Sequence, residues 1–304
     1  MTAIMGFDIG GTKIETAVFD ATTKQEILRK KIPTPGNYTD FMAAIKFLVD
    51  EAEKAVGESC LVGMGFPGII TKDGILQNYN NLPFLKGDIV HDVEKLLSRR
   101  VKAANDADCF ALSETFDGAA KGANLAFCAI LGTGNGAGIT FEGKLLQGKT
   151  GCAGEWGHIS QPYPDSDWEL GQSCSCGGKG HIEALNSAPA LVRIYNEKST
   201  LKVTDSAEIY ERYKRGEQIA GEVLNGFYGR LARAFVAVSN LIDPDVFVLG
   251  GGLSQIDEIY DNVPALYAEY MKKINGISVT MDLRRAEYGA SSGLRGAAWL
   301  CLSE

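Results

Sequence analysis

The chain has 304 residues, of which 45% are apolar and 22% are charged, as in typical globular proteins. Its net charge of −8 and its lack of a basic stripe argue against a nucleic acid partner. No apolar run approaches the ~20 residues that span a bilayer, and no basic-then-apolar signal segment is present, so we expect a cytoplasmic protein without a membrane segment. Seven cysteines, an odd number, suit a reducing compartment in which thiols stay free or bind metal.

Hydrophobic periodicity predicts an α/β chain that is long enough for two domains, with no low-complexity linker between them. The predicted strands cover 3–8, 14–20, 25–33, 61–66, 101–104, 125–131, 136–142, 246–249 and 278–283. The predicted helices cover 39–56, 89–97, 109–121, 189–197, 206–216, 217–241, 256–273 and 292–300.

The first glycine turn lies between the first two predicted strands and consists of Gly10, Gly11, Thr12 and Lys13. Its backbone N–H groups can form a nest for phosphate oxygens, with a hydroxyl and an ammonium group beside it. Asp8, just before the turn, could hold Mg²⁺ through water. A plain hairpin turn explains the glycines equally well.

The second glycine turn repeats this arrangement half a chain later, with Gly132, Thr133 and Gly134 between two further predicted strands. This spacing indicates internal duplication. Two such turns facing one another would hold the phosphates of a nucleotide from both sides.

A triple glycine, Gly250, Gly251 and Gly252, follows the predicted strand at 246–249. It permits close approach of a flat ligand, although tight packing of the turn is the alternative explanation.

A loop rich in asparagine covers residues 76–83 and includes Asn81. Its amides suit the hydroxyl groups of a sugar, but asparagines at a strand end are also ordinary turn formers.

Asp106 lies at the carboxyl end of one predicted strand and close to the amino end of the next helix. Ligands of α/β sheets bind at such places, and the helix dipole keeps the carboxylate ionised, as a general base requires. The alternative is that Asp106 or Asp108 only caps the helix.

Two of the chain's three histidines and two cysteines lie in one stretch, as His158, Cys174, Cys176 and His181. Two thiolates and two imidazoles suit a tetrahedral zinc site. Because all four ligands would come from the protein, this zinc would be structural and would hold a loop in place. The alternative is a glycine-rich loop that carries these residues by chance.

Seven short motifs follow one another along the chain. They are DIGGTK at 8–13, GFPG at 65–68, NDAD at 105–108, LGTGNGAGI at 131–139, GEWGH at 154–158, CSCGGKGHIE at 174–183 and LGGGL at 249–253. In this order they resemble the ROK family of sugar kinases, within the actin, Hsp70 and hexokinase-like superfamily. Each motif alone is weak, but the ordered set spans essentially the whole chain and is highly specific.

The resemblance implies an α/β fold of two ribonuclease-H-like (actin/hexokinase-like) domains with a ligand cleft between them. The first domain is expected at 1–118 plus 291–304, and the second, with the zinc loop, at 119–290. The resemblance also implies ATP, Mg²⁺ and structural Zn²⁺ as cofactors, a small-molecule hexose as substrate, and a homodimer.

The resemblance also assigns roles to residues. Asp106 would take the proton of the primary hydroxyl of the sugar as that hydroxyl attacks the γ-phosphoryl group. The sugar would be bound by Gly68, Asn81, Asn105, Asp106, Glu155, His158 and Glu183. The nucleotide would be bound by Asp8, Gly10, Gly11, Thr12, Lys13, Gly132, Thr133, Gly134, Gly250, Gly251 and Gly252. One ring nitrogen of His158 would ligate zinc while the other meets a sugar hydroxyl.

The motifs indicate the identity of the sugar less specifically than they indicate the family. GEWGH, DGAAKGA at 117–123 and SSGLRGAAWL at 291–300 look most like bacterial fructokinases or mannokinases, so we expect phosphorylation of the 6-hydroxyl of a fructose, mannose or glucose type of hexose, fructose first. NLP at 81–83 looks more like glucose and N-acetylhexosamine kinases, which makes an N-acetylglucosamine or N-acetylmannosamine kinase the alternative.

A sugar-sensing ROK regulator without catalysis is the alternative from a different class. The intact motifs at 8–13 and 105–108 argue against it, and we expect no DNA-binding segment ahead of the first motif.

Two positions depart from the family pattern. His181 stands where a cysteine is usual, which could weaken metal retention, and Asn135 stands where an apolar residue is usual.

Overall fold

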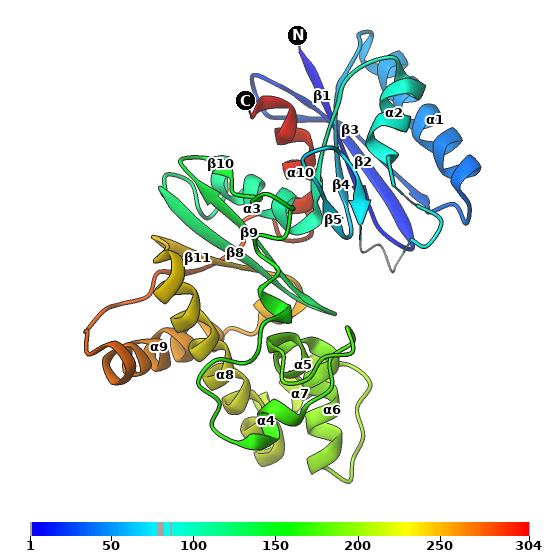
Figure 1. Ribbon diagram of the computed structural model, residues 1–304. Coiled ribbons are helices and arrows are strands. Elements are labelled where there is room, and N and C mark those ends of the chain that lie inside the picture. The colour runs from blue at the N-terminus through cyan, green and yellow to red at the C-terminus, as the bar shows by residue number, and fades with distance from the viewer. Residues whose placement is uncertain (1, 78–81, 86, 304) are drawn as a thin grey trace. The chain divides into compact units, whose positions relative to one another are not determined.

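The computed structural model describes residues 2–77, 82–85 and 87–303 (Figure 1). Contacts within the chain divide it into two compact units. Unit 1 comprises Met1–Lys121, Gly138–Ala153 and Ala290–Glu304, and unit 2 comprises Gly122–Ala137 and Gly154–Gly289. The segment 138–153 therefore packs with unit 1, whereas the sequence placed it in the second domain; the expected domain boundaries stay a prediction.

The first sheet has the strand order β3-β2-β1-β4-β7. Its strands are β1 (Ala3–Ile9), β2 (Lys13–Asp20), β3 (Glu26–Pro33), β4 (Leu61–Phe66) and β7 (Val101–Asn105). β1, β2 and β3 pair antiparallel in sequence, and β1, β4 and β7 are parallel. A separate antiparallel pair, β5 (Ile69–Ile70) and β6 (Leu76–Gln77), follows β4.

Helices cover both faces of this sheet because neighbouring residues of a strand point to opposite sides. Met5 and Phe7 of β1 pack into the core under α1 (Tyr38–Val56) and α2 (Ile89–Leu97), whereas Ile4 packs into the core under α3 (Asp106–Phe116) and α10 (Ser292–Trp299). Figure 1 shows α1 and α2 on one side of the sheet and α10 on the other. α10 lies very close to the sheet, since a Cβ atom on Gly63 would lie 1.8 Å from the carbonyl oxygen of Ala297.

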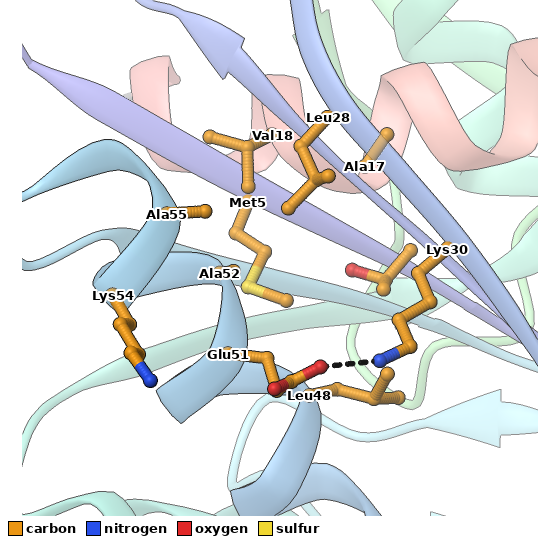
Figure 2. A pocket seen from close by; sticks show the side chains of 11 residues that line it. Met5, Ala17, Val18, Leu28, Lys30, Leu48, Glu51, Ala52, Lys54 and Ala55 are labelled. Atoms are coloured by element: carbon orange, nitrogen blue, oxygen red, sulfur yellow. Dashed lines mark hydrogen bonds and ion pairs between the residues drawn. The ribbon is translucent and has the colours of Figure 1, made fainter.

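Unit 1 contains a cavity of about 410 Å³ between α1 and strands β1 to β3. Its interior is mainly apolar, and a Lys30–Glu51 ion pair of 2.5 Å lies beside it (Figure 2). None of the residues predicted to bind sugar, nucleotide or metal lines this cavity.

The second sheet has the order β10-β9-β8-β11-β12. Its strands are β8 (Leu125–Leu131), β9 (Asn135–Phe141), β10 (Lys144–Leu145), β11 (Val246–Gly250) and β12 (Leu283–Arg285). β8 is parallel to β11, as β1 is parallel to β4 in the first sheet. Each glycine turn therefore follows the equivalent strand of its sheet, in keeping with internal duplication.

The helices of unit 2 are α4 (Asp167–Gly171), α5 (Ile182–Asn186), α6 (Ala188–Lys198), α7 (Ser206–Lys214), α8 (Gln218–Ile242) and α9 (Ile259–Asn275). α8 packs against α5, α6, α7 and α9. Aromatic rings join it to the sheet: Phe235 of α8 stacks on Trp156 and contacts Phe247 of β11.

Most predicted elements lie within two residues of the observed ones, but three differ by more, among them the helix expected at 256–273, which is α9 and begins at Ile259. The helix expected at 109–121 is α3, which begins three residues earlier and ends at Phe116. The strand expected at 278–283 is instead β12, which begins at Leu283, where pairing with Phe247 starts. Within the described residues, no helix combines the length and apolar character needed to cross a membrane.

Candidate active site and metal site

The first glycine turn joins β1 to β2 and is held by its own hydrogen bonds. The Gly10 N–H donates to the carbonyl of Lys13 at 2.9 Å, and the Thr34 hydroxyl donates to the carbonyl of Gly10 at 2.6 Å. Gly11 and Thr12 at the tip are exposed. The turn therefore presents a fixed, exposed backbone, as a phosphate nest requires.

Asp8 lies near the end of β1, directly before this turn. Burial raises the pKa of the Asp8 carboxyl above its usual value, and the positive charge of Lys13 partly opposes this effect. Lys13 donates to Glu15 at 3.0 Å. A partly desolvated carboxylate is stabilised by a nearby cation, which agrees with the predicted role of Asp8 near Mg²⁺.

Asn105, rather than either aspartate, is the N-cap of α3. Its side chain accepts a hydrogen bond from the Ala107 N–H at 2.8 Å and donates to the carbonyl of Gly68 at 2.8 Å. Asp108 is buried and accepts from Gln147 at 2.9 Å, whereas Asp106 is exposed in the first turn of α3. Neither aspartate is the N-cap residue, although Asp106 Oδ1 also accepts from the Ala107 N–H at 2.8 Å, and the exposure of Asp106 suits a general base.

The second glycine turn joins β8 to β9. The Gly132 N–H donates to the carbonyl of Gly134 at 3.0 Å, and the Ala188 N–H donates to the carbonyl of Gly132 at 2.8 Å. Thr133 at the tip is exposed. Asn135 begins β9 and is buried, so the polar residue at this position does not interrupt the strand.

The second and third residues of the triple glycine have different surroundings. Gly251 has a φ of 80°, and a Cβ atom on it would lie 2.3 Å from the carbonyl oxygen of Leu131, so packing alone explains this glycine. Gly252 begins the 3-10 helix η2 (Gly252–Gln255), and a Cβ atom on it would meet nothing within 4 Å. The space beside Gly252 is thus compatible with a flat ligand.

The four predicted metal ligands lie together. One donor atom from each of His158, Cys174, Cys176 and His181 lies within 4.8 Å of all the others. His158 Nδ1 is 3.8 Å from Cys174 Sγ, and His181 Nδ1 is 3.3 Å from Cys176 Sγ. Ligand atoms around tetrahedral zinc are about 3.5 Å apart, given bonds of ~2.0–2.3 Å. The donor set and its spacing therefore fit zinc.

Local structure brings these ligands together. His158 ends the 3-10 helix η1 (Trp156–His158), and His181 is the N-cap of α5. Between them, the Cys174 N–H donates to the carbonyl of Gly178 at 2.9 Å, and the Gly177 N–H donates to Cys174 at 3.0 Å. We call residues 174–181 the metal loop. Burial raises the pKa of the Cys174 thiol, so a bound cation would be needed to hold its thiolate.

Two predicted sugar ligands flank the metal loop, and a third is outside the described residues. Glu155 is half-buried directly before η1, and its carbonyl accepts from the His158 N–H at 3.3 Å. Glu183 lies in the first turn of α5, and its carboxylate accepts from the Asn135 N–H at 3.1 Å and from the Ser175 hydroxyl at 3.0 Å. Asn81 lies outside the part of the chain that the structure describes.

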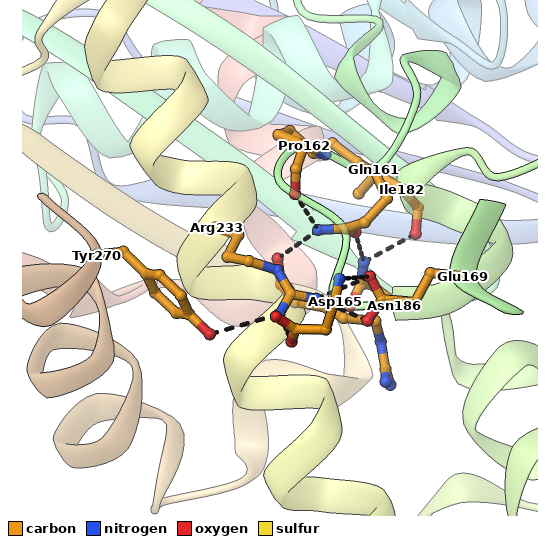
Figure 3. Close-up of polar contacts among 9 residues, drawn as sticks. Gln161, Pro162, Asp165, Glu169, Ile182, Asn186, Arg233 and Tyr270 are labelled. Carbon is orange, nitrogen blue, oxygen red and sulfur yellow. Dashed lines mark hydrogen bonds and ion pairs between the residues drawn. The ribbon is translucent and has the colours of Figure 1, made fainter. Parts of the chain in front are cut away.

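A buried polar network that the sequence did not predict anchors the segment ahead of the metal loop to α8 (Figure 3). Arg233, which is 1% exposed, donates to both carboxylate oxygens of Glu169 at 2.6 and 2.9 Å and also contacts Asp165. Gln161 donates to the carbonyl of Arg230 at 3.0 Å. Arg230 and Arg233 lie on the apolar side of α8. Charged residues at these positions of the sequence could have indicated a buried polar network.

Comparisons with known proteins agree with these observations. The model of the ROK family matches residues 4–304. The chain is 37% identical to the N-acetyl-D-glucosamine kinase of Pectobacterium atrosepticum, over 98% of this chain and 99% of that protein. It is 35% identical to the N-acetyl-D-glucosamine kinase of Vibrio cholerae, over 97% and 98%.

Two solved structures are similar over nearly the whole chain. The ROK hexokinase from Thermus thermophilus has a TM-score of 0.85 at 29% identity, with 98% of this chain and 97% of that chain covered. The ROK glucokinase from Streptomyces griseus, solved with glucose and AMPPNP, has a TM-score of 0.77 at 26% identity, with 98% of each chain covered.

These matches and the fold define a sugar kinase, an ATP-dependent phosphotransferase with two ribonuclease-H-like α/β domains. The chain belongs to the ROK family. The predicted fold class, family and type of enzyme are confirmed.

Proposed function

We propose that this protein transfers the γ-phosphoryl group of ATP to the primary hydroxyl of an N-acetylhexosamine, with N-acetylglucosamine as the preferred acceptor. The observation that carries this proposal is the 37% identity, over nearly both whole chains, to a kinase named for that sugar. The expectation that fructose comes first is therefore less well supported than its alternative.

Asp106 is proposed as the general base. Its exposed carboxylate takes the proton of the sugar hydroxyl, the hydroxyl oxygen forms a bond to the γ-phosphorus, and the bond to the β-phosphate oxygen breaks as ADP leaves. Asn105 supports this position, since its side chain links the start of α3 to the carbonyl of Gly68.

The two glycine turns are proposed to bind the phosphates, and Gly252 to lie beside the adenosine. Mg²⁺ would be held near Asp8, where it would neutralise charge on the phosphates. In-line positioning and neutralisation of this charge account for most of the rate of phosphoryl transfer.

Structural zinc is proposed at His158, Cys174, Cys176 and His181. Because His158 Nδ1 faces Cys174 Sγ, its Nε2 is the nitrogen left for a sugar hydroxyl. Metal binding would thus fix the orientation of a substrate contact, next to Glu155 and Glu183.

The test is ATP-dependent ADP release by the metal-loaded protein with N-acetylglucosamine, N-acetylmannosamine, glucose, mannose and fructose in parallel. We expect kcat/KM for N-acetylglucosamine to exceed that for fructose by on the order of tenfold or more, since a buried acetamide contact discriminates by at least ~1.4 kcal/mol. A preference for fructose would contradict the proposed acceptor but keep the kinase. Sugar binding by calorimetry without turnover would identify a sensor instead.

A homodimer is also proposed, on the basis of the family resemblance. Light scattering during size-exclusion chromatography tests it directly, because a monomer has a mass of 32.6 kDa.

A further inference from the structure

One carboxylate in unit 2 connects the metal loop to the second glycine turn. Glu183 Oε1 accepts from the hydroxyl of Ser175, which lies between the two cysteines of the metal cluster. Glu183 Oε2 accepts from the backbone N–H of Asn135, the residue that follows the second glycine turn. Ser175, Glu183 and Asn135 therefore form a continuous chain of hydrogen bonds of 3.0 and 3.1 Å.

The residues around Asn135 are closely packed against Glu183 and against η1. A Cβ atom on Gly134 would lie 2.8 Å from Glu183 Oε2, and a Cβ atom on Gly157 would lie 2.1 Å from the carbonyl oxygen of Asn135. The neighbour of Gly134 is the end of a side chain, whereas the neighbour of Gly157 is backbone, so the second contact is the less adaptable of the two. Such tight packing transmits a displacement on one side to the other.

Metal ligands lie next to Ser175 and close to Glu183 in the sequence. Cys174 and Cys176 are the neighbours of Ser175, and His181 is two residues before Glu183. The turn at 174–178 has two backbone hydrogen bonds between Cys174 and the glycines that follow it, and the chain on either side of the turn pairs through Ser173 and Lys179. Ser175 is exposed, so a metal bound by its two neighbours would restrain its hydroxyl further.

We infer that Ser175 and Glu183 are positioning residues that couple metal binding at the metal loop to nucleotide binding at the second glycine turn. This inference rests on the proposed roles of both sites. Metal in the loop fixes Ser175, Ser175 orients the carboxylate of Glu183, and the carboxylate holds the N–H of Asn135 and so the adjoining turn. Because coupling between two binding sites is reciprocal, the nucleotide also strengthens retention of the metal.

The test measures one quantity, the ratio of the Kd for an ATP analogue with Mg²⁺ after zinc removal to the Kd before it. Titrations are made without sugar, so that the proposed sugar contact of Glu183 does not enter. In the wild type we expect a ratio of about 5 or more, the lower end for coupled sites. Ser175→Ala should bring the ratio to about 2 or less, and Glu183→Gln should do the same, while both variants still bind zinc.

A second readout is the rate of zinc release to a chromogenic chelator. ATP analogue should slow this release in the wild type by a similar factor and should have little effect in Ser175→Ala. Ser173→Ala is the matched control, because it removes a hydroxyl from an exposed residue of the same stretch whose backbone pairs with Lys179. It should keep the wild-type ratio.

The outcomes separate this inference from the proposed function. A wild-type ratio of 1, or an unchanged ratio in Ser175→Ala, overturns the coupling while the kinase assignment stands. Failure of the wild type to bind the nucleotide or zinc would instead contradict the proposed sites themselves.

Discussion

Asp106 and Asp108 stand two residues apart in the first turn of α3, yet their surroundings differ. Asp108 is buried against Gln147, and Asp106 is exposed. A base must be reached by the substrate, so exposure favours Asp106.

Replacing Asp106 by asparagine removes the base and preserves the shape of the side chain. We expect turnover to fall on the order of a hundredfold or more with little change in the Kd for the sugar, because general-base catalysis acts mainly in the transition state. Steady-state kinetics and calorimetry measure the two effects. Asp108→Asn is the control for loss of charge in the same turn, and near-normal turnover in Asp106→Asn would remove this residue from the role.

Asp8 illustrates a conflict between stability and activity at a single residue. Burial raises the pKa of its carboxyl above the ordinary value of 3.8, so the folded chain binds this proton more tightly than the unfolded chain does. The stabilisation is complete below the unfolded pKa and is lost as the pH rises through the folded pKa. At neutral pH the charged carboxylate therefore costs stability when no cation is bound.

Asp8→Asn should accordingly raise the Tm at pH 7 in the absence of Mg²⁺ and ATP, and this gain should shrink as the pH falls toward 4. The same change should lower kcat/KM on the order of tenfold or more, since it removes a charge near the proposed Mg²⁺ position. Calorimetric scans between pH 4 and 7 measure the first effect. A Tm below that of the wild type at pH 7 would show that the charged form is stabilised in the fold.

At the scale of elements, α4 is a helix of five residues, and its contacts with α8 hold it in position. Burial raises the pKa of Glu169 in α4, and the charge of Arg230 opposes this, so the carboxylate relies on nearby arginines. Arg233 is the one that hydrogen bonds to it directly. Asp165 adds little, because its side chain is 67% exposed and its charge is screened.

Arg233→Met should reduce the free energy of unfolding by about 3 kcal/mol, because it leaves Glu169 buried without its hydrogen-bonded partner. The double variant Arg233→Met with Glu169→Gln should recover only part of this loss, because it removes the unpaired carboxylate but also takes the charge of Glu169 away from the buried Arg230. Urea unfolding of the wild type, the two single variants Arg233→Met and Glu169→Gln, and the double variant forms a complete cycle. A double variant that is less stable than Arg233→Met would contradict this explanation.

The helices differ in how well the sequence predicts them. α1 and α8 have clear apolar stripes, and their predicted bounds were within one residue. α3 is buried on all sides from Ala107 to Thr115, so it has no stripe from which its start could be located. The helices α4 and α5 have five residues each, which is too short for a 3.6-residue period to be visible.

For the whole molecule, the metal cluster was predictable because its ligands are rare residue types at short spacings. The contacts of Arg233 with Glu169 and of Glu183 with Asn135 join positions that are 64 and 48 residues apart, respectively. Local sequence patterns do not predict contacts at such separations. The order of motifs along the chain fixed the family, whereas the preferred sugar depends on pocket shape, which a motif describes poorly.

The packing of α10 has a consequence for how the protein is made. This helix is formed by residues 292–299, yet it lies against β1 and β4 through Gly6 and Gly63, and its Trp299 is completely buried. Because residues 292–299 are synthesised after all five strands of the first sheet, that sheet lacks one of its covering helices until α10 has left the ribosome. A chain that stops before residue 292 would therefore leave the apolar face of that sheet exposed.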